Sequence, residues 1–328
     1  MLVLGRDEVR QLLGLDALID ALAVAMADLS SGRASVPPRV GALVAERGAF
    51  LGAMPGYVPS IGALASKLVT LFPRNAGTGV PTHQAVIVVF DPATGSPLAL
   101  LDGTEITAVR TAAGSALSAR LLAREDAAVL AILGTGVQAR THARALVRVR
   151  PVREIRVAGR ERGRAALVAD ELAGDLGVPV RAAASYEEAL DGAELACAVT
   201  AAVEPVVRRE WLSPGVHVSS VGFNPPGREV DDATLADALV CVESRAAVLA
   251  PHPAGSTDVV DPVRAGVLAE EDIVEVGELV LGTRAGRTSE DQITLYKSVG
   301  VAVQDAAAAA LVLAAARENG AGREIDLD

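Results

Sequence analysis

The chain has 328 residues, enough for two domains or one large α/β unit, and its formal net charge is -11. Hydrophobic residues make up 51% of it, but aromatic residues only 2%. Nucleic-acid-binding surfaces need clustered Lys and Arg and often aromatic side chains that stack on bases. This composition therefore argues against nucleic acid as a partner.

Neither metal binding nor membrane insertion is predicted. The two cysteines, Cys197 and Cys241, lie in apolar stretches without metal-ligand spacing, as buried thiols in a reducing compartment do. The N-terminus carries charges too early for a signal peptide, and the Ala-rich C-terminal segment contains Gln304 and Asp305. We expect a cytoplasmic protein with no metal and no membrane span.

The first third of the chain predicts a small α+β region. Apolar residues recur at helical spacing over residues 6–30, with a break at Gly14, which indicates two short helices. Strand-like runs separated by Gly, Pro and Asn turns fill residues 36–101. A helix should follow, with Thr104 as its N-cap.

After Arg124, predicted strands alternate with predicted helices, the pattern of βαβ units in a parallel sheet. We expect a doubly wound Rossmann-type domain over residues 119–299. From Lys297 onward we expect one long helix, with no strand after it, that folds back on the N-terminal region. Residues 1–118 and 300–328 should then form a smaller α+β domain.

A glycine-rich turn joins the first predicted strand of the Rossmann domain to its helix. Gly134, Gly136 and Ala139 form a G-x-G-x-x-A pattern directly after the apolar run AAVLAIL. The first glycine permits a tight turn, the second lets backbone N–H groups approach a pyrophosphate, and the small third residue allows close packing of helix and strand. The alternative is a turn that is only structural, but its context favours a dinucleotide.

The end of the next strand bears on which dinucleotide is bound. NAD enzymes commonly carry an acidic residue there, whereas this chain has Gly159 followed by Arg160, Glu161 and Arg162. Arginines at this place favour a 2′-phosphate, and hence NADPH over NADH. A solvated charge run is the other interpretation, and Glu161 could still serve NADH.

Three cations stand in apolar surroundings in the first third of the chain: Arg39, Lys67 and Arg110. A buried cation needs an anion nearby, and no acidic residue lies within four positions of Arg39 or Lys67. Distant acidic residues could pair with each of them. Three such cations in one small domain indicate convergence on a substrate carboxylate.

Long ordered motifs resemble the ornithine cyclodeaminase and mu-crystallin family. They include KLVTLFPRNAGTGVPTHQAVIVVFDPATGSPLALLDGTEITAVRTAAGSA, GTGVQA, WLSPGVHVSSVG and GRTSEDQITLYKSVGVAVQDAAAA, and together they cover almost the whole chain. The resemblance implies a nicotinamide cofactor, a small amino or imino acid substrate, and a homodimer formed through the N-terminal domain. That domain is thereby also implied to bind the substrate.

The resemblance also implies roles for individual residues. Those that would bind the substrate carboxylate or line its pocket are Arg39, Lys67, Thr82, Arg110 and Thr111. Lys67 is in addition the best candidate for proton traffic at an imine nitrogen, and His83 is either polar lining or a structural histidine. Those that would contact the dinucleotide are Gly134, Thr135, Gly136, Val137, Gln138, Arg160, Thr200, Val221, Gly222, Lys297, Ser298 and Gly300.

One position distinguishes the activities within that family. Ornithine cyclodeaminases carry an Asp in the loop where this chain has Asn224, and a neutral amide cannot accept a proton from an ammonium group. We therefore expect an imine reductase that acts on Δ1-pyrroline-2-carboxylate, Δ1-piperideine-2-carboxylate or an acyclic imino acid. The alternatives are an ornithine or lysine cyclodeaminase, with Glu229 or Asp231 replacing the missing Asp, and a non-catalytic NADP-binding protein like mu-crystallin.

Overall fold

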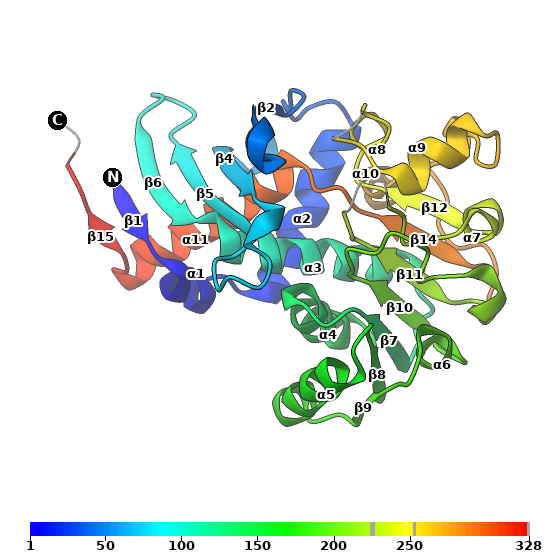
Figure 1. The fold of residues 1–328 in the computed structure, drawn as a ribbon. Coiled ribbons are helices and arrows are strands. Elements are labelled where there is room, and N and C mark those ends of the chain that lie inside the picture. Colours follow the sequence, from blue (N-terminus) through cyan, green and yellow to red (C-terminus); the bar gives the residue numbers. More distant parts are fainter. Residues whose placement is uncertain (224–226, 252–253, 327–328) are drawn as a thin grey trace. The chain divides into compact units, whose positions relative to one another are not determined.

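The computed structural model describes residues 1–223, 227–251 and 254–326. The chain divides into two compact units (Figure 1). Unit 1 is Met1–Arg110 with Val301–Asp328, and unit 2 is Thr111–Gly300. The boundary falls inside one helix, α3 (Gly103–Leu122).

Unit 1 is built on a seven-stranded sheet. Its strands, in spatial order, are β15 (Arg323–Glu324), β1 (Leu2–Leu4), β6 (Pro97–Asp102), β5 (His83–Phe90), β4 (Ala63–Leu71), β3 (Ala49–Val58) and β2 (Val40–Val44). Neighbouring strands are antiparallel except β1 and β6, which are parallel. Three-residue 3-10 turns lie at the ends of these strands: η1 (Ala45–Arg47), η2 (Pro59–Ile61) and η3 (Pro73–Asn75).

Helices α1 (Arg6–Leu12), α2 (Leu15–Ser30) and α11 (Ala302–Asn319) complete unit 1. Gly14, the predicted break, is the N-cap of α2. Helix α11 packs on α2 and on β3, β4 and β5 (Figure 1). At Gly56 the strand approaches α11 so closely that a β-carbon would lie 2.9 Å from that of Ala302. The C-terminal helix thus closes the core of the N-terminal sheet.

Three local predictions are wrong, one on α3 and two on the C-terminal segment. The cap of α3 is Asp102, whose Oδ1 accepts the Glu105 N–H at 2.7 Å, because the Thr104 hydroxyl accepts the Ala85 N–H instead. The long C-terminal helix begins at Ala302, since Lys297 ends a buried strand and Gly300 adopts a φ of 73°. A short strand, β15, follows that helix and pairs with β1.

Unit 2 contains an eight-stranded sheet in which every neighbouring pair is parallel. Its strands in spatial order are β13 (Val274–Glu275), β12 (Leu239–Val242), β14 (Thr294–Lys297), β11 (His217–Ser220), β10 (Leu195–Ala198), β7 (Val129–Leu133), β8 (Glu154–Ala158) and β9 (Val180–Ala182). Its helices besides α3 are α4 (Val137–Val149), α5 (Arg162–Leu176), α6 (Tyr186–Leu190), α7 (Asp232–Asp237), α8 (Arg245–Val248), α9 (Thr257–Arg264) and α10 (Val276–Leu281), with 3-10 turns η4 (Arg209–Trp211) and η5 (Glu270–Asp272). The predicted α/β class with a parallel Rossmann-type sheet is confirmed.

The strand order of unit 2 reverses at β7. That strand pairs with β8 on one side and with β10 on the other, so the loops after β7 and β10 leave the sheet side by side. Open α/β sheets bind their ligands at such a reversal, outside the carboxyl ends of the strands. Both cysteines are buried in strands of this sheet. Within the part of the chain that the structure describes, no helix is both long enough and apolar enough to cross a membrane.

Candidate active site

A buried cluster of charge lies between the sheet of unit 1 and its C-terminal helix. Lys67 lies on β4, Arg110 on α3 and Asp305 on the first turn of α11. The Lys67 Nζ is 2.8 Å from Asp305 Oδ2, and the Arg110 Nε is 3.0 Å from Asp305 Oδ1. All three side chains are nearly inaccessible to solvent, so one carboxylate is shared by two cations.

Gln304 completes this cluster. Its Oε1 accepts a hydrogen bond from Arg110 Nη1 at 3.1 Å and another from the Val301 N–H at 3.1 Å, which also caps α11. Because both partners are donors, the side-chain oxygen must face them and the amide NH2 must point away. That Nε2 is buried and has no hydrogen-bond partner among the described residues.

The cluster shifts the pKa values of its members. Burial lowers the pKa of Lys67 to about 8, against the opposing effect of Asp305 and with further lowering by Arg110 and Arg39. Burial together with the charges of Lys67 and Arg110 lowers the pKa of His83 to about 4. At neutral pH His83 is therefore uncharged. The pKa of Lys67 lies close enough to neutral pH for its ammonium group to release and regain a proton.

The structure brings together some of the residues predicted to bind the substrate. Lys67 and Arg110 meet on Asp305, and Arg39 is near enough for its charge to act on Lys67. Thr82 directly precedes β5, where its carbonyl accepts the Phe72 N–H. Thr111 is buried on α3 and belongs to unit 2. Asn224 lies outside the described residues.

Sequence reasoning missed Asp305 and Gln304 as parts of this cluster. A signal was present, because Asp305 is the only charged residue between Lys297 and Arg317. An acid in the middle of an otherwise apolar helix predicts a buried cation partner. Asp305 is thus a distant acid that pairs with Lys67, and two of the three predicted cations, Lys67 and Arg110, meet on it.

The glycine-rich turn of unit 2 has the geometry of a dinucleotide-binding turn. Gly134 adopts a φ of 131°, and Gly136 is the N-cap of α4. A β-carbon added at Gly136 would have no neighbour within 4 Å among the described atoms, so the N-terminus of α4 is open to a ligand. At Gly159, which directly follows β8, an added β-carbon would lie 2.7 Å from Thr135 Cγ2.

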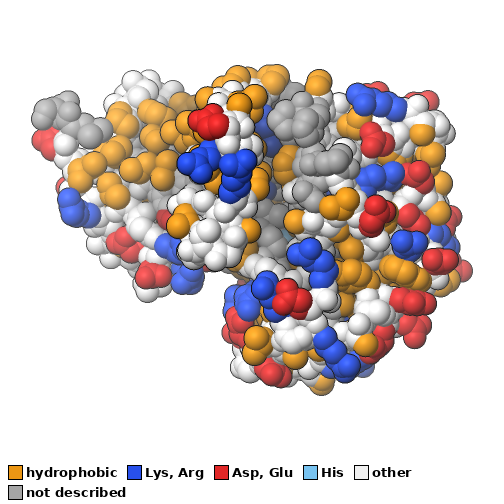
Figure 2. All heavy atoms as spheres, viewed as in Figure 1, with side chains coloured by type: hydrophobic (Ala, Val, Ile, Leu, Met, Phe, Trp, Pro, Cys, Tyr) orange, Lys and Arg blue, Asp and Glu red, His pale blue; other side chains and the backbone are white. Residues whose placement is uncertain are grey.

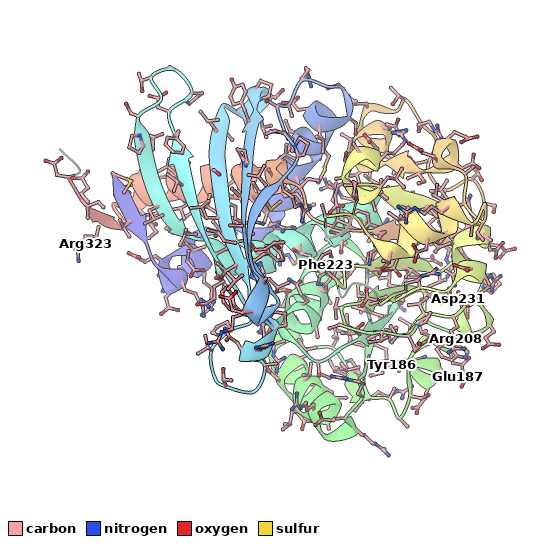
Figure 3. All side chains as sticks on the ribbon, turned by 45° about the horizontal axis from the view of Figure 1, so that its top comes forward. Tyr186, Glu187, Arg208, Phe223, Asp231 and Arg323 are labelled. Carbon is pink, nitrogen blue, oxygen red and sulfur yellow. The ribbon has the colours of Figure 1, made fainter. Side chains whose placement is uncertain are left out.

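Arg160 is exposed directly after Gly159. The neighbouring acid, Glu161, forms an ion pair with Arg164 at 3.0 Å. The Glu161 carboxylate is therefore already paired with Arg164 of α5. The charge of Arg160 instead acts on Tyr186 at the start of α6 (Figure 3), where it opposes the rise in the Tyr186 pKa that burial causes.

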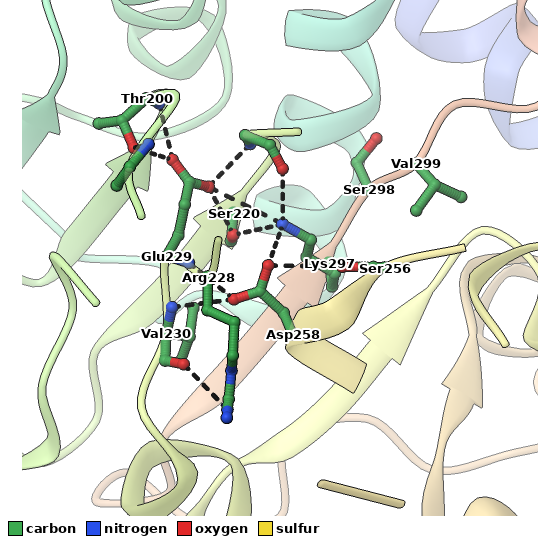
Figure 4. A network of polar contacts seen from close by, with 12 residues as sticks. Thr200, Ser220, Arg228, Glu229, Val230, Ser256, Asp258, Lys297, Ser298 and Val299 are labelled. Carbon is green, nitrogen blue, oxygen red and sulfur yellow. Dashed lines mark hydrogen bonds and ion pairs between the residues drawn. The ribbon is translucent and has the colours of Figure 1, made fainter. Parts of the chain in front are cut away.

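A second buried ionic network lies at the carboxyl ends of β10, β11 and β14 (Figure 4). The Lys297 Nζ is 2.8 Å from Asp258 Oδ2 and 2.9 Å from both Ser220 Oγ and the Gly222 carbonyl oxygen. The carboxylate of Glu229 accepts hydrogen bonds from the N–H and hydroxyl of Thr200, the hydroxyl of Ser220 and the N–H of Gly222, all at 2.6–2.7 Å. The Lys297 ammonium thus joins Asp258, which lies on α9, to the end of β11 at Ser220 and to the loop that follows it at Gly222.

Glu243 plays a similar part for the segment after β14. Its carboxylate accepts the Ser298 hydroxyl at 2.5 Å and the backbone N–H groups of Val299 and Gly300 at 3.1 Å. The Val221 N–H in turn donates to the Ala198 carbonyl. The predicted dinucleotide contacts Thr200, Val221, Gly222, Ser298 and Gly300 are therefore all held in loops fixed by buried carboxylates or strand pairing. No group of three metal-binding side chains occurs among residues 1–223, 227–251 and 254–326.

A parallel sheet that reverses its strand order beside a glycine-rich βα turn defines unit 2 as a Rossmann-type domain. The chain belongs to the ornithine cyclodeaminase/mu-crystallin family, whose model matches residues 1–320. Ketimine reductase mu-crystallin of Mus musculus is 39% identical over 300 residues, which cover 90% of each chain.

Two solved structures carry the same fold over their full length. Thermococcus litoralis Δ1-pyrroline-2-carboxylate reductase, in complex with NADH and L-proline, has 37% identity and a TM-score of 0.94, covering 99% of this chain and 100% of that one. An archaeal alanine dehydrogenase dimer with bound NAD has 30% identity and a TM-score of 0.92, covering 100% and 99%. The predicted family is confirmed.

Proposed function

We propose that this protein is a nicotinamide-dependent imine reductase, which converts a small carboxylated imine to the amino acid. The observation that carries the proposal is the Lys67–Asp305–Arg110 cluster, two buried cations on one carboxylate. With both cations protonated it retains one positive charge, which matches one substrate carboxylate. Relatives named as a ketimine reductase, a Δ1-pyrroline-2-carboxylate reductase and an alanine dehydrogenase support this chemistry.

Unit 1, with the next residue of α3, Thr111, is the proposed substrate-binding part. Arg110, Lys67 and Arg39 would hold the substrate carboxylate, and Thr82 and Thr111 would line the pocket. The Lys67 ammonium is the group from which the imine nitrogen would receive a proton, because its pKa of about 8 leaves it mostly protonated yet able to release a proton near neutrality. Holding the carboxylate also holds the adjacent C=N carbon in place to receive the hydride. The protein would therefore accelerate the reaction mainly by positioning the imine relative to the nicotinamide.

Unit 2 is the proposed cofactor-binding part. The open N-terminus of α4 and the left-handed Gly134 suit a pyrophosphate, and the nicotinamide would supply the hydride. The residues proposed to contact the cofactor are Gly134, Thr135, Gly136, Val137, Gln138, Arg160, Thr200, Val221, Gly222, Lys297, Ser298 and Gly300. The Lys297 ammonium is engaged by Asp258, Ser220 and Gly222, so we propose that Lys297 acts on the cofactor site mainly by holding the segment at Ser220 and Gly222 in place (Figure 4).

We further propose NADPH as the preferred cofactor. Arg160 is exposed just after the second strand of the glycine-rich βα unit, where Rossmann-type domains commonly recognise the adenosine ribose, and this supports a 2′-phosphate contact. The ion pair of Glu161 with Arg164 makes Glu161 less available to a ribose hydroxyl.

A cyclodeaminase would need a carboxylate base near the substrate amine, and the two substitutes for Asn224 are occupied. Glu229 receives four hydrogen bonds in a buried site. Asp231 caps α7 by accepting from the N–H and hydroxyl of Thr234. These contacts favour reduction of a ready-made imine over cyclisation with loss of ammonia.

The open face of the unit 1 sheet supports a homodimer. Leu51, Leu68 and Val86 each expose about 40% of their surface, and Leu68 pairs in register with Val86. Figure 2 shows hydrophobic side chains gathered over β5 and β6. Large exposed apolar patches mark interaction surfaces, and we propose that a second copy covers this one.

The test is an assay of purified protein with NADPH, and separately NADH, on Δ1-pyrroline-2-carboxylate, Δ1-piperideine-2-carboxylate and an acyclic imino acid. We expect the nicotinamide absorbance to fall with at least one imine. Ornithine and lysine with NAD are assayed in parallel for released ammonia. Proline and ammonia from ornithine, without imine reduction, would make the chain a cyclodeaminase, and cofactor binding without any turnover would make it a binding protein.

A further inference from the structure

The chain contains only two lysines among its 30 basic Lys and Arg residues. Both are buried: Lys67 is 2% exposed and Lys297 is 0% exposed. Each pairs at 2.8 Å with an aspartate from a distant part of the sequence, Asp305 and Asp258 respectively. Arginine serves every other basic position, so lysine is confined to two sites where a compact ammonium meets a buried carboxylate.

Asp305 is the only acid among the groups that act on Lys67. The others are Arg110 on α3, Arg39 before β2 and His83 on β5. The other strand beside β4, β3, carries no Asp, Glu, Lys, Arg or His, and its one ionisable side chain is Tyr57. Without Asp305, every charge facing Lys67 would be positive. Burial and these charges would then favour the neutral amine.

The geometry shows that Asp305 does more than balance charge. Its two oxygens face different cations, Oδ2 toward Lys67 Nζ and Oδ1 toward Arg110 Nε. Gln304, its neighbour on the same helical turn, accepts from Arg110 Nη1. The start of α11 thus fixes the direction of both cations at once.

We propose that Asp305 is the positioning residue of the imine-reducing site, which keeps Lys67 protonated and orients Lys67 and Arg110 toward one substrate carboxylate. This inference rests on the proposed function. Asp305 itself does not touch the substrate, because both its oxygens face the two cations it orients. Its loss should therefore change the protonation of Lys67 before it changes anything else in the site.

Having only two lysines makes a direct test possible. Protein labelled with 13C at the lysine ε-carbon gives two side-chain signals, which a Lys297→Arg variant assigns. We would titrate both signals in the wild type, in Asp305→Asn and in Asp28→Asn. Asp28 is the matched control, because it is a fully buried carboxylate of unit 1, ion-paired with Arg33 at 2.6 Å and remote in sequence from the cluster.

We expect Asp305→Asn to lower the titration midpoint of Lys67 by about one unit or more, while Lys297 stays unchanged. The alkaline limb of kcat/KM for the imine should move down by the same amount. Asp28→Asn should move neither. A Lys67 midpoint that is the same in Asp305→Asn and in the wild type would overturn the proposal.

A second variant separates charge from direction and covers the case in which Asp305→Asn does not fold. Asp305→Glu keeps the charge but displaces the carboxylate by one methylene. We expect its Lys67 midpoint to stay near that of the wild type and its KM for the imine to rise about tenfold, with a smaller change in kcat. A wild-type KM in this variant would overturn the orienting role.

The titration does not depend on activity. If the wild type reduces no imine, the proposed function fails whatever the Lys67 signal does. If the wild type is active and Lys67 titrates as before in Asp305→Asn, only the inference about Asp305 fails.

Discussion

Gly134 lies against Val199 so closely that a β-carbon at this glycine would be 2.6 Å from the Val199 carbonyl oxygen. These residues belong to the loops that follow β7 and β10, the two strands between which the order of the sheet reverses. The close contact leaves the first position of the glycine-rich turn no room for a side chain, and its φ of 131° is also unsuited to one.

We therefore predict that Gly134→Ala lowers both stability and dinucleotide affinity. The added methyl must push the two loops apart, which costs about 2 kcal/mol or more in unfolding free energy. Thermal unfolding and titration of nicotinamide fluorescence check the two effects separately.

Gly136→Ala is the matched control. Its φ is an ordinary -84°, and the added methyl meets no described atom. Its midpoint of unfolding should stay within about 2 °C of the wild type, while affinity for the dinucleotide falls at least tenfold, because the methyl occupies the place proposed for the pyrophosphate. Equal loss of stability in the two variants would contradict this account of the turn.

Replacing Arg160 should change the choice of cofactor. In Arg160→Ala we expect the KM for NADPH to rise about tenfold and the KM for NADH to change less than threefold, since only NADPH carries the 2′-phosphate. Arg144→Ala is the control, because that exposed arginine pairs with Asp175 and not with Glu161. Initial rates with both cofactors provide the measurement, and an unchanged ratio of the two KM values in Arg160→Ala would argue for NADH.

Two buried histidines should make the fold sensitive to acid. His142 Nδ1 donates to the Gln138 carbonyl at 2.8 Å, and burial lowers its pKa to about 4. Burial lowers the pKa of His217 to about 3. The unfolded chain binds protons at these residues near pH 6.5, so stability is lost as the pH falls from about 6.5 toward 4.

Each histidine should contribute about 1.4 kcal/mol of lost stability per pH unit within that window. Urea unfolding at pH 7, 6 and 5 measures the slope. His142→Gln should be less stable at pH 7 but should flatten the slope by one proton. A slope that is the same in this variant and in the wild type would show that His142 is protonated in the folded state.

The apolar face of the unit 1 sheet should be the dimer surface. We predict that the double variant Leu68→Glu, Val86→Glu is a monomer in light scattering where the wild type is a dimer. Each subunit would otherwise bury two negative charges without partners in the interface. Leu167→Glu is the control, since Leu167 is 68% exposed on α5 in unit 2. A dimer that persists in the double variant would place the interface elsewhere.

The sequence predicted regular elements well where their signals are local. The glycine-rich turn follows a run of apolar residues, and the strands LACA, HVSS and LVCV stand out as short apolar or alternating segments, so the parallel sheet of unit 2 could be inferred. The cap at Asp102 was missed because Thr104 is an equally good capping residue by type, and only the pairing of Thr104 with Ala85 distinguishes them.

The candidate site was predictable only in part, since its anions come from far along the chain. Lys67 and Asp305 are 238 positions apart in sequence, and their pairing depends on α11 packing against β4. The same holds for Lys297, whose place in a motif suggested a cofactor contact but whose ammonium is enclosed by Asp258, Ser220 and Gly222. Residue type and motif order indicate that a cation matters, but only the fold shows which atoms it faces.

The most direct test of the central claim follows a hydride into the product. Protein is mixed with NADPH carrying deuterium at both C4 positions of the nicotinamide and with Δ1-pyrroline-2-carboxylate, and the proline formed is analysed by mass spectrometry. The account predicts proline with one deuterium, located on the α-carbon, and loss of this product in Lys67→Met. Proline without deuterium, or no proline from any of the three imines, would contradict it.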